Sequence, residues 1–146
     1  MANTGERQDP FGNFNFRVEI DGITRAYFQE CSGFDSAIDV IEHREGGDAA
    51  VRKLPGVTKY SNITLKWGTT DDAELYNWHL DWVKGDPRAK RKSGSVVLLD
   101  RRGDDKIRWN FREAWPTKWT APTFNATGTE VAIETLEITH EGIERA

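Results

Sequence analysis

The sequence predicts a mainly antiparallel β fold, a sandwich or barrel of about seven or eight strands with one flanking α-helix. Three observations lead to this fold class. Most apolar residues recur at every second position, as in half-buried strands. Turn signals such as Asp21-Gly22 separate these runs. Only the segment between Asp71 and Gly85 combines helical periodicity with helix-start and helix-stop signals.

The amino-terminal part reads as three strands. Apolar and polar residues alternate from Phe14 to Ile20, which predicts the first strand. Asp21-Gly22 then predicts a tight turn, so that Ile23–Cys31 returns beside the first strand as a hairpin. Ser32-Gly33 breaks the pattern, and Ala37–Arg44 is expected to be a third strand.

A long loop is expected over Glu45–Gly56, where paired glycines and a Pro-Gly step interrupt any periodicity. Ordering such a segment costs roughly 1–2 kcal/mol of backbone entropy per residue, so a loop of this length suggests a function. A solitary domain would have little reason to keep it, so the loop is a candidate contact surface. The candidate contact residues are Glu45, Gly46, Gly47, Asp48, Arg52, Lys53, Leu54, Pro55 and Gly56.

The later strands follow the same alternation. Val57–Trp67 and Ile107–Phe111 each place apolar side chains on one face, and Val96–Leu99 is a short continuous apolar run, typical of a strand covered on both sides. The last apolar run changes phase between Ile133 and Leu136. One inserted residue reverses the faces of a strand, so this change predicts a bulge.

The predicted helix has Asp71 at its start, with Glu74 as the capping-box partner, and it ends at Gly85. Its polar residues form one narrow stripe, so its apolar surface is wider than one sheet needs. We therefore expect the helix to pack on its own sheet and also against another subunit. The candidate interface residues are Leu75, Trp78, Leu80, Trp82 and Val83.

Length and composition limit the function classes. The 146 residues are enough for one domain. We expect a flexible polar segment over residues 1–9 and a single domain over 10–146. No apolar run reaches the roughly 20 residues that a membrane helix needs, and the amino terminus does not resemble a signal peptide. A net charge of −4 argues against sequence-independent binding of nucleic acid, and the single Cys31 excludes an intramolecular disulfide.

No arrangement of residues points to catalysis, to a metal site or to a cofactor. His43, His79 and His140 each lack a second ligand at a metal-binding spacing, and no nucleophile elbow, phosphate loop, HExxH or CxxC motif occurs. The paired acids Asp71-Asp72 and Asp104-Asp105 fall at a helix start and a turn, where acidic residues favour local structure. We therefore expect a protein that is not an enzyme.

Two further features leave alternatives open. A basic cluster follows the helix; its simplest interpretation is a solvated loop, then a partner-docking surface, with nucleic acid third. Trp115 and Trp119 flank Pro116 and offer a platform on which a sugar would stack. The basic cluster consists of Lys84, Arg88, Lys90, Arg91 and Lys92.

Four segments carry a resemblance to a known family. They are FNFRVEIDGI near the start, IEHREGGDAAVRKLPGVTKYSNITLKWG in the first half, WNFREAWPTKW in the second half, and GTEVAIETLEITHEGIER at the end. In this order they resemble the phage tail tube proteins, which also occur in extracellular contractile injection systems. The resemblance spans most of residues 10–145 and is weak over 85–92.

The resemblance implies a β-barrel-like fold shared with the Hcp proteins of type VI secretion. It also implies six-membered rings that stack into a hollow inner tube, which a sheath drives into a target. In such tubes the loop that corresponds to Glu45–Gly56 would reach the adjacent ring and so act as the ring-stacking loop. The implied partners are further copies of the chain, a sheath protein, baseplate, spike and cap proteins, and cargo in the lumen. The protein would be made in the bacterial cytoplasm and assembled into particles that are released. One alternative is a paralogue that starts the tube at the baseplate; another is a carbohydrate-binding module.

Overall fold

The computed structural model of the protein describes residues 9–12, 15–23, 28–47 and 49–146. The expected fold class is confirmed: the chain is mainly antiparallel β with one helix. Its elements are, in order, β1 (Phe16–Ile20), β2 (Glu30–Ser32), β3 (Ala37–His43), β4 (Arg52–Lys59), β5 (Ile63–Gly68), α1 (Glu74–Val83), β6 (Lys92–Leu99), β7 (Asp105–Thr120), β8 (Ile133–Thr139) and β9 (Gly142–Arg145).

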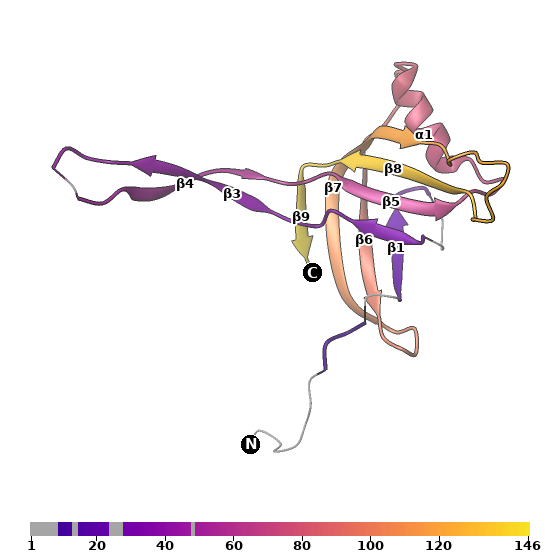
Figure 1. The fold of residues 1–146 in the computed structure, drawn as a ribbon, viewed down its shortest axis with the longest axis horizontal. Helices are drawn as coiled ribbons and strands as arrows, with labels where there is room; N and C mark the ends of the chain where they lie inside the picture. Colours follow the sequence, from indigo (N-terminus) through magenta and orange to yellow (C-terminus); the bar gives the residue numbers. More distant parts are fainter. Residues whose placement is uncertain (1–8, 13–14, 24–27, 48) are drawn as a thin grey trace.

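Seven of the strands form one strongly bent sheet, in the order β1-β6-β7-β8-β5-β2, and β9 is added beside β7. The sixteen-residue β7 pairs with β6 and β9 along its first half and with β8 along its second half. It bends between the halves at Glu113, whose φ of 51° is unusual for a residue with a side chain. We call β1, β6, β9 and the first half of β7 the β6 sheet, and β2, β5, β8 and the second half of β7 the β5 sheet. In Figure 1 the strands of the two sheets cross.

The core lies between these two sheets. Side chains alternate strictly along β5 and β8, with every second residue buried. The helix closes one end of this core with Leu75 and Trp78, which are 0% and 4% exposed. The buried apolar residues of the core cluster are Val18, Ile20, Ile23, Ile63, Leu65, Trp67, Leu75, Trp78, Phe111, Ala114, Leu136 and Ile138.

Among the described residues, the expected amino-terminal hairpin does not extend beyond its turn. The tight turn forms, with Gly22 at a φ of 74°, and the described pairing beside it is the isolated bridge between Ile20 and Ile23. Beyond it β1 pairs with β6, and the short β2 pairs with β5. The local turn signal was correct, and the long-range partners override it. Phe14 and residues 24–27 of the expected strands lie outside the described residues.

The expected loop over Glu45–Gly56 is wrong in its second half. β4 begins at Arg52 and pairs with β3, so Arg52, Lys53, Leu54, Pro55 and Gly56 belong to a strand. The sequence of β4 shows no regular alternation of apolar and polar residues. The reason is that the strand register shifts between Ile38 and Val40, so apolar side chains change from one face of the ribbon to the other. A turn that contains Gly46 and Gly47 joins the strands, and Asp48 lies outside the described residues.

Strands β3 and β4 form a separate two-stranded ribbon, residues 37–59, which we call the arm. It extends away from the two sheets (Figure 1). The expected strand Val57–Trp67 is therefore two strands, with a junction at residues 60–62. Asp35 holds this junction by accepting hydrogen bonds from the amide and the hydroxyl of Ser61. Gly33 faces it at a φ of 96°, and a Cβ there would lie 2.1 Å from the Asn62 oxygen, so only glycine fits.

The helix begins later than expected and ends as expected. The capping box with Asp71 does not form; instead Asp72 accepts a hydrogen bond from the amide of Glu74. At the other end Gly85 has a φ of 65°, and its amide donates to the Trp82 carbonyl while the Asp86 amide donates to the Asp81 carbonyl. This pair of bonds is a Schellman motif.

The bulge expected in the last apolar run is wrong. β8 pairs with β5 in continuous register from Ile133 to Ile138, and the irregularity lies in β7, between Pro116 and Lys118. The apparent change of phase arises because the buried position before Leu136 holds a carboxylate, Glu134, which is 8% exposed.

Candidate assembly surfaces

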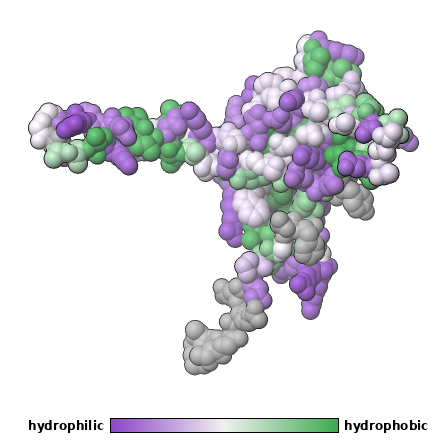
Figure 2. Space-filling model, in the orientation of Figure 1, coloured by the Kyte–Doolittle hydropathy of each residue, from purple (hydrophilic) through white to green (hydrophobic). Residues whose placement is uncertain are grey.

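The arm exposes more apolar surface than any other described element. All seven residues of β3 and seven of the eight residues of β4 are exposed. Figure 2 shows apolar patches along the arm, outside the main body. An isolated two-stranded ribbon in water is marginally stable at best, so this element needs a further contact. Its exposed large apolar residues are Ile38 (58%), Val40 (61%), Ile41 (52%), Val51 (45%), Leu54 (46%) and Val57 (67%).

The arm is apolar on both of its faces. Ile41 pairs with Leu54 on one face, and the neighbouring pair, Val40 and Pro55, points to the opposite face because successive side chains alternate. Glu42 lies opposite Lys53, and Lys59 bonds Asp39 at 2.9 Å, so part of the arm's charge is paired within it. A single flat surface would cover only one of these apolar faces.

The helix residues divide into core and surface. Leu75 and Trp78 cannot reach another subunit because they are buried in this chain, which corrects their assignment to an interface. Leu80 and Trp82 are half-buried, and Val83 is 65% exposed. The expected interface therefore shrinks to the carboxyl-terminal turn of the helix.

Trp82 packs against Trp115 of β7, with ring centroids 5.1 Å apart, and its buried indole N–H has no hydrogen-bond partner among the described residues. We expect Trp82→Ala to lower the free energy of unfolding by about 2–4 kcal/mol, somewhat less than the roughly 3–5 kcal/mol of a fully buried tryptophan, because the ring is only half-buried. Urea unfolding followed by circular dichroism measures this loss. Val83→Ala is the matched control on the same turn, and equal midpoints for the two variants would show that Trp82 does not support the fold.

The two tryptophans proposed as a sugar platform are both engaged. Trp115 faces Trp82, and Trp119 packs edge-on against Tyr76 at 4.7 Å. The Trp119 indole also donates a 3.1 Å hydrogen bond to Glu134, whose second oxygen accepts one from Trp67 at 3.1 Å. Glu134 thus joins β5, β7 and β8 from inside the core, a role that the sequence pattern did not indicate.

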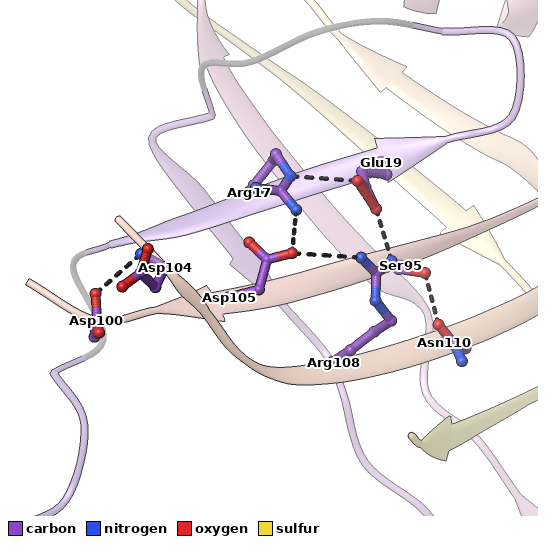
Figure 3. A network of polar contacts seen from close by, with 8 residues as sticks. All are labelled: Arg17, Glu19, Ser95, Asp100, Asp104, Asp105, Arg108 and Asn110. Carbon is purple, nitrogen blue, oxygen red and sulfur yellow. Dashed lines mark hydrogen bonds and ion pairs between the residues drawn. The ribbon is translucent and has the colours of Figure 1, made fainter. Parts of the chain in front are cut away.

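A charged network covers the outer face of the β6 sheet (Figure 3). Arg17 contacts Asp105 at 2.8 Å and Glu19 at 3.3 Å, and Arg108 contacts Glu19 at 2.7 Å. Val97 lies opposite both arginines in the strand register and is 0% exposed, so the network covers an apolar side chain. The polar residues of β1 and of the first half of β7 thus form one surface.

These contacts have an electrostatic consequence at low pH. The hydrogen bond from Arg108 lowers the pKa of Glu19, and the hydrogen bond from Arg17 lowers the pKa of Asp105. A carboxyl with a lowered folded-state pKa adds stability above its unfolded-state pKa and loses it as the pH falls through the folded-state value. Stability should therefore be flat near neutrality and fall below the ordinary carboxyl range of about pH 4.

Urea midpoints of the wild type and of Asp105→Asn, measured between neutral and acidic pH, test this expectation. The difference between the two proteins should be largest near neutrality and vanish in acid, where Asp105 of the wild type is protonated in the folded and in the unfolded state. A difference that stays constant with pH would mean that the carboxylate does not stabilise the fold through its charge.

The basic cluster follows the helix and is largely solvated. Arg88 bonds Asp86 at 3.3 Å and is 88% exposed, and Arg91 bonds Glu141 at 3.0 Å. Lys84 caps the helix, Lys90 is exposed, and Lys92 is half-buried in β6. The residues do not converge on a single concave site, which favours the interpretation as a solvated loop.

The three histidines each lie close to another group of the chain. His140 accepts a hydrogen bond from the Gly142 amide and lies 2.9 Å from the Ser61 carbonyl, and His79 lies 3.3 Å from the Pro116 carbonyl. His43 lies 3.7 Å from Glu45 in the arm. In the part of the chain that the structure describes, no three potential ligands gather around a metal position, and the ten-residue helix is too short to cross a membrane.

Residues 12–144 match the family model described as T4-like virus tail tube protein gp19. No curated protein sequence matches the chain. Among solved structures, a chain of the PVC sheath-tube complex, an extracellular contractile injection system in its extended state, is 27% identical, with a TM-score of 0.82 over 94% of this chain and 91% of that one.

Two further structures extend the comparison. A chain of the anti-feeding prophage cap, which terminates the tube of that prophage, is 27% identical. Its TM-score is 0.83 over 100% of this chain and 99% of that one. Hcp1 from Flavobacterium johnsoniae is 21% identical, with a TM-score of 0.57 over 90% and 94% of the two chains, and shares the fold.

Proposed function

The chain belongs to the T4-like virus tail tube protein gp19 family and is a structural tube subunit, and we propose that it builds the inner tube of a contractile injection system. Six copies close into a ring, and the rings stack into a hollow tube. Residues 10–146 act in this assembly as one domain. The likeness to chains of tube and cap complexes at 27% identity supports this role.

The observation that carries the proposal is the arm. It exposes apolar side chains on both faces, and it stands clear of the body, as an element does when another molecule completes its packing. We propose that the arm contacts the adjacent ring, with Arg52 and Lys53 near its tip facing acidic residues of that ring. Residues 44–47 and 49–51, at the far end of the arm, are the part that lies furthest from the body (Figure 1).

A closed ring needs two different complementary surfaces on each subunit. The exposed carboxyl-terminal turn of α1, with Val83 beside Trp82, is one candidate surface. The open edges of the sheets, at β1, β2 and β9, are others, because an unpaired strand edge tends to acquire a partner. The structure has several strand edges of this kind. Ring closure and ring stacking can therefore use separate surfaces.

The partners follow from the same role. We propose a sheath protein outside the tube, baseplate and spike proteins at one end, a cap protein at the other, and cargo inside. The protein would be assembled in the bacterial cytoplasm and released in phage-tail-like particles. Since Trp115 and Trp119 are engaged within the chain, the carbohydrate-binding alternative loses the feature on which it rested. We propose that the subunit catalyses no reaction.

Electron microscopy of the purified chain, over a range of concentrations, tests the assembly. We expect six-membered rings and, at higher concentration or with the sheath protein present, stacked tubes. Sedimentation velocity should show the corresponding species above the monomer. Monomer alone at every concentration, with no rings in particles isolated from the host, would overturn the proposal.

A further inference from the structure

His140 lies where the arm joins the body, at the corner between β8 and β9. The backbone pairing of β5 with β8 ends at Ile63 and Ile138. Two residues further towards the arm, the imidazole Nε2 of His140 lies 2.9 Å from the Ser61 carbonyl oxygen. The chain then turns into β9 beside the base of the arm (Figure 1). A side chain therefore continues the connection at the point where the backbone ladder stops.

The two contacts of the ring determine which of its nitrogens carries the proton. The amide of Gly142 donates a hydrogen bond to Nδ1 at 3.2 Å. An amide N–H can only donate, so Nδ1 must present its lone pair. A neutral imidazole then carries its proton on Nε2, which faces the Ser61 carbonyl, a group that can only accept. Both contacts are therefore hydrogen bonds of the neutral Nε2–H tautomer of His140.

The two residues that His140 joins belong to different parts of the fold. Ser61 lies in the junction at residues 60–62, where Asp35 accepts hydrogen bonds from its amide and its hydroxyl. Gly142 is the first residue of β9, and a Cβ there would overlap the Arg112 guanidinium, so the chain is closely fitted at this corner. The ring thus ties the base of the arm to the β6 sheet, in addition to the tie that Asp35 provides.

A second proton on the ring is incompatible with this arrangement. It would bind to Nδ1, which faces the N–H of Gly142, so two donors would oppose each other across the 3.2 Å contact. Either the ring turns away or the start of β9 moves, and in both cases the tie between the junction and β9 is lost. An imidazole ordinarily takes up this proton at about pH 6.5, so the tie is sensitive to mild acid.

The titratable and charged groups around the ring come from several elements. The ring of Tyr60, in the junction, lies 5.7 Å from the imidazole between centroids. The Arg112 guanidinium of β7 lies against the residue that donates to Nδ1, so a cation stands close to the place where the second proton would bind. Asp35 binds the junction, and Glu141 binds Arg91 at 3.0 Å. Both of these neighbouring carboxylates are therefore engaged with other groups.

We propose that His140 is a proton-sensitive latch at the base of the arm. The neutral ring fixes the junction to the start of β9, and the protonated ring releases it, so that the arm moves more freely about the junction. The pairs of β5 and β8 do not involve the ring, so the change is local and the core stays in place. Any molecule that packs on the arm then meets a fixed arm at neutral pH and a hinged arm in mild acid. The inference concerns the single subunit and does not depend on the proposed tube.

An NMR titration of the unmodified chain, at a concentration where sedimentation shows the monomer, tests the latch. Long-range proton–nitrogen spectra identify the tautomer, and we expect the His140 proton on Nε2 near neutrality. When the pH falls through about 6.5, exchange of the Gly142 amide, corrected for its intrinsic rate, should rise about tenfold, as expected for the loss of one hydrogen bond. Amide relaxation should show greater mobility of the arm, while the core amides of Leu65 and Leu136 keep their protection. A proton on Nδ1 near neutrality, or an unchanged Gly142 amide in mild acid, would overturn the proposal.

His140→Asn separates the two hydrogen bonds. An asparagine side chain accepts readily from the amide two residues further on, so the Gly142 amide should stay protected at every pH, while the shorter side chain cannot reach Ser61. The arm of this variant should therefore be mobile at neutral and at acidic pH alike. His79→Asn is the matched control, because His79 is also half-buried but lies on the helix, 3.3 Å from the Pro116 carbonyl. It should keep the wild-type response.

An acid-induced change that persists in His140→Asn, or that disappears in His79→Asn, would show that another group controls the arm and would overturn the proposal. If His140→Asn does not fold, the titration of the unmodified chain still decides, since it reports the tautomer and the Gly142 amide directly.

Discussion

Replacing Ile41 and Leu54 together by serine is expected to abolish tubes and to leave the isolated subunit folded. The two side chains form a cross-strand pair on one face of the arm and are 52% and 46% exposed, so they add little to the subunit alone. Burial of each against an adjacent ring would contribute about 1.5–3 kcal/mol, and every subunit of a ring would lose both contributions. Electron microscopy counts rings and tubes, and calorimetry measures the melting temperature.

Val131→Ser is the matched control, because Val131 is 76% exposed and lies outside the arm. It should assemble like the wild type. The double variant should melt within about 4 °C of the wild type, since surface substitutions rarely change stability by more than about 0.5 kcal/mol. Tubes of normal length and number from the double variant would show that the stacking contact lies on another element.

Trp67→Ala is expected to unfold most of the protein. Trp67 is 1% exposed and is among the largest fully buried side chains, so its truncation should cost about 3–5 kcal/mol. It also removes the indole that donates to Glu134, and a buried carboxylate oxygen left without that donor adds about 1–3 kcal/mol. Together these losses approach the 5–15 kcal/mol that typically stabilises a whole domain.

Urea unfolding followed by circular dichroism separates the two contributions. Trp67→Phe keeps an aromatic ring in the core and removes the hydrogen-bond donor, so its midpoint should lie between those of the wild type and of Trp67→Ala. A Trp67→Ala protein that unfolds at the wild-type urea concentration would mean that the core does not depend on this side chain.

The fold class could be predicted from local patterns because many residues have the local structure that their types favour. β5 and β8 alternate strictly, and Gly85 ends the helix in the conformation that glycine favours. The pairing of strands did not follow, because partners such as β1 and β6 lie far apart in the chain and no local feature of either strand identifies the other. The turn at Asp21-Gly22 therefore suggested a neighbour that the sheet does not use.

The candidate surfaces remain predictions, and the structure of one of them was predicted only in part. The segment around Gly46-Gly47 forms a turn, but a strand whose residues are exposed on both faces has no alternation to reveal it. Glu134 is the opposite case: a carboxylate at an inward position reads as a break in the pattern unless its two tryptophan donors are known. In the helix, burial of Leu75 and Trp78 could not be separated from an interface, since both demand apolar side chains.

The order in which the strands pair has a consequence for biosynthesis. β1 cannot pair until β6 has been synthesised, since Phe16 pairs with Leu98. β5 likewise cannot pair with β8 until that strand has been synthesised, since Ile63 pairs with Ile138. β9, the last strand, joins β7 only when residues 142–145 have been made. Pairings of such long sequence separation form slowly, so the subunit completes its fold only after residues 142–145 have left the ribosome. A nascent chain that has not reached β9 therefore lacks a finished subunit surface, which keeps synthesis of this part of the chain and growth of the polymer apart in time.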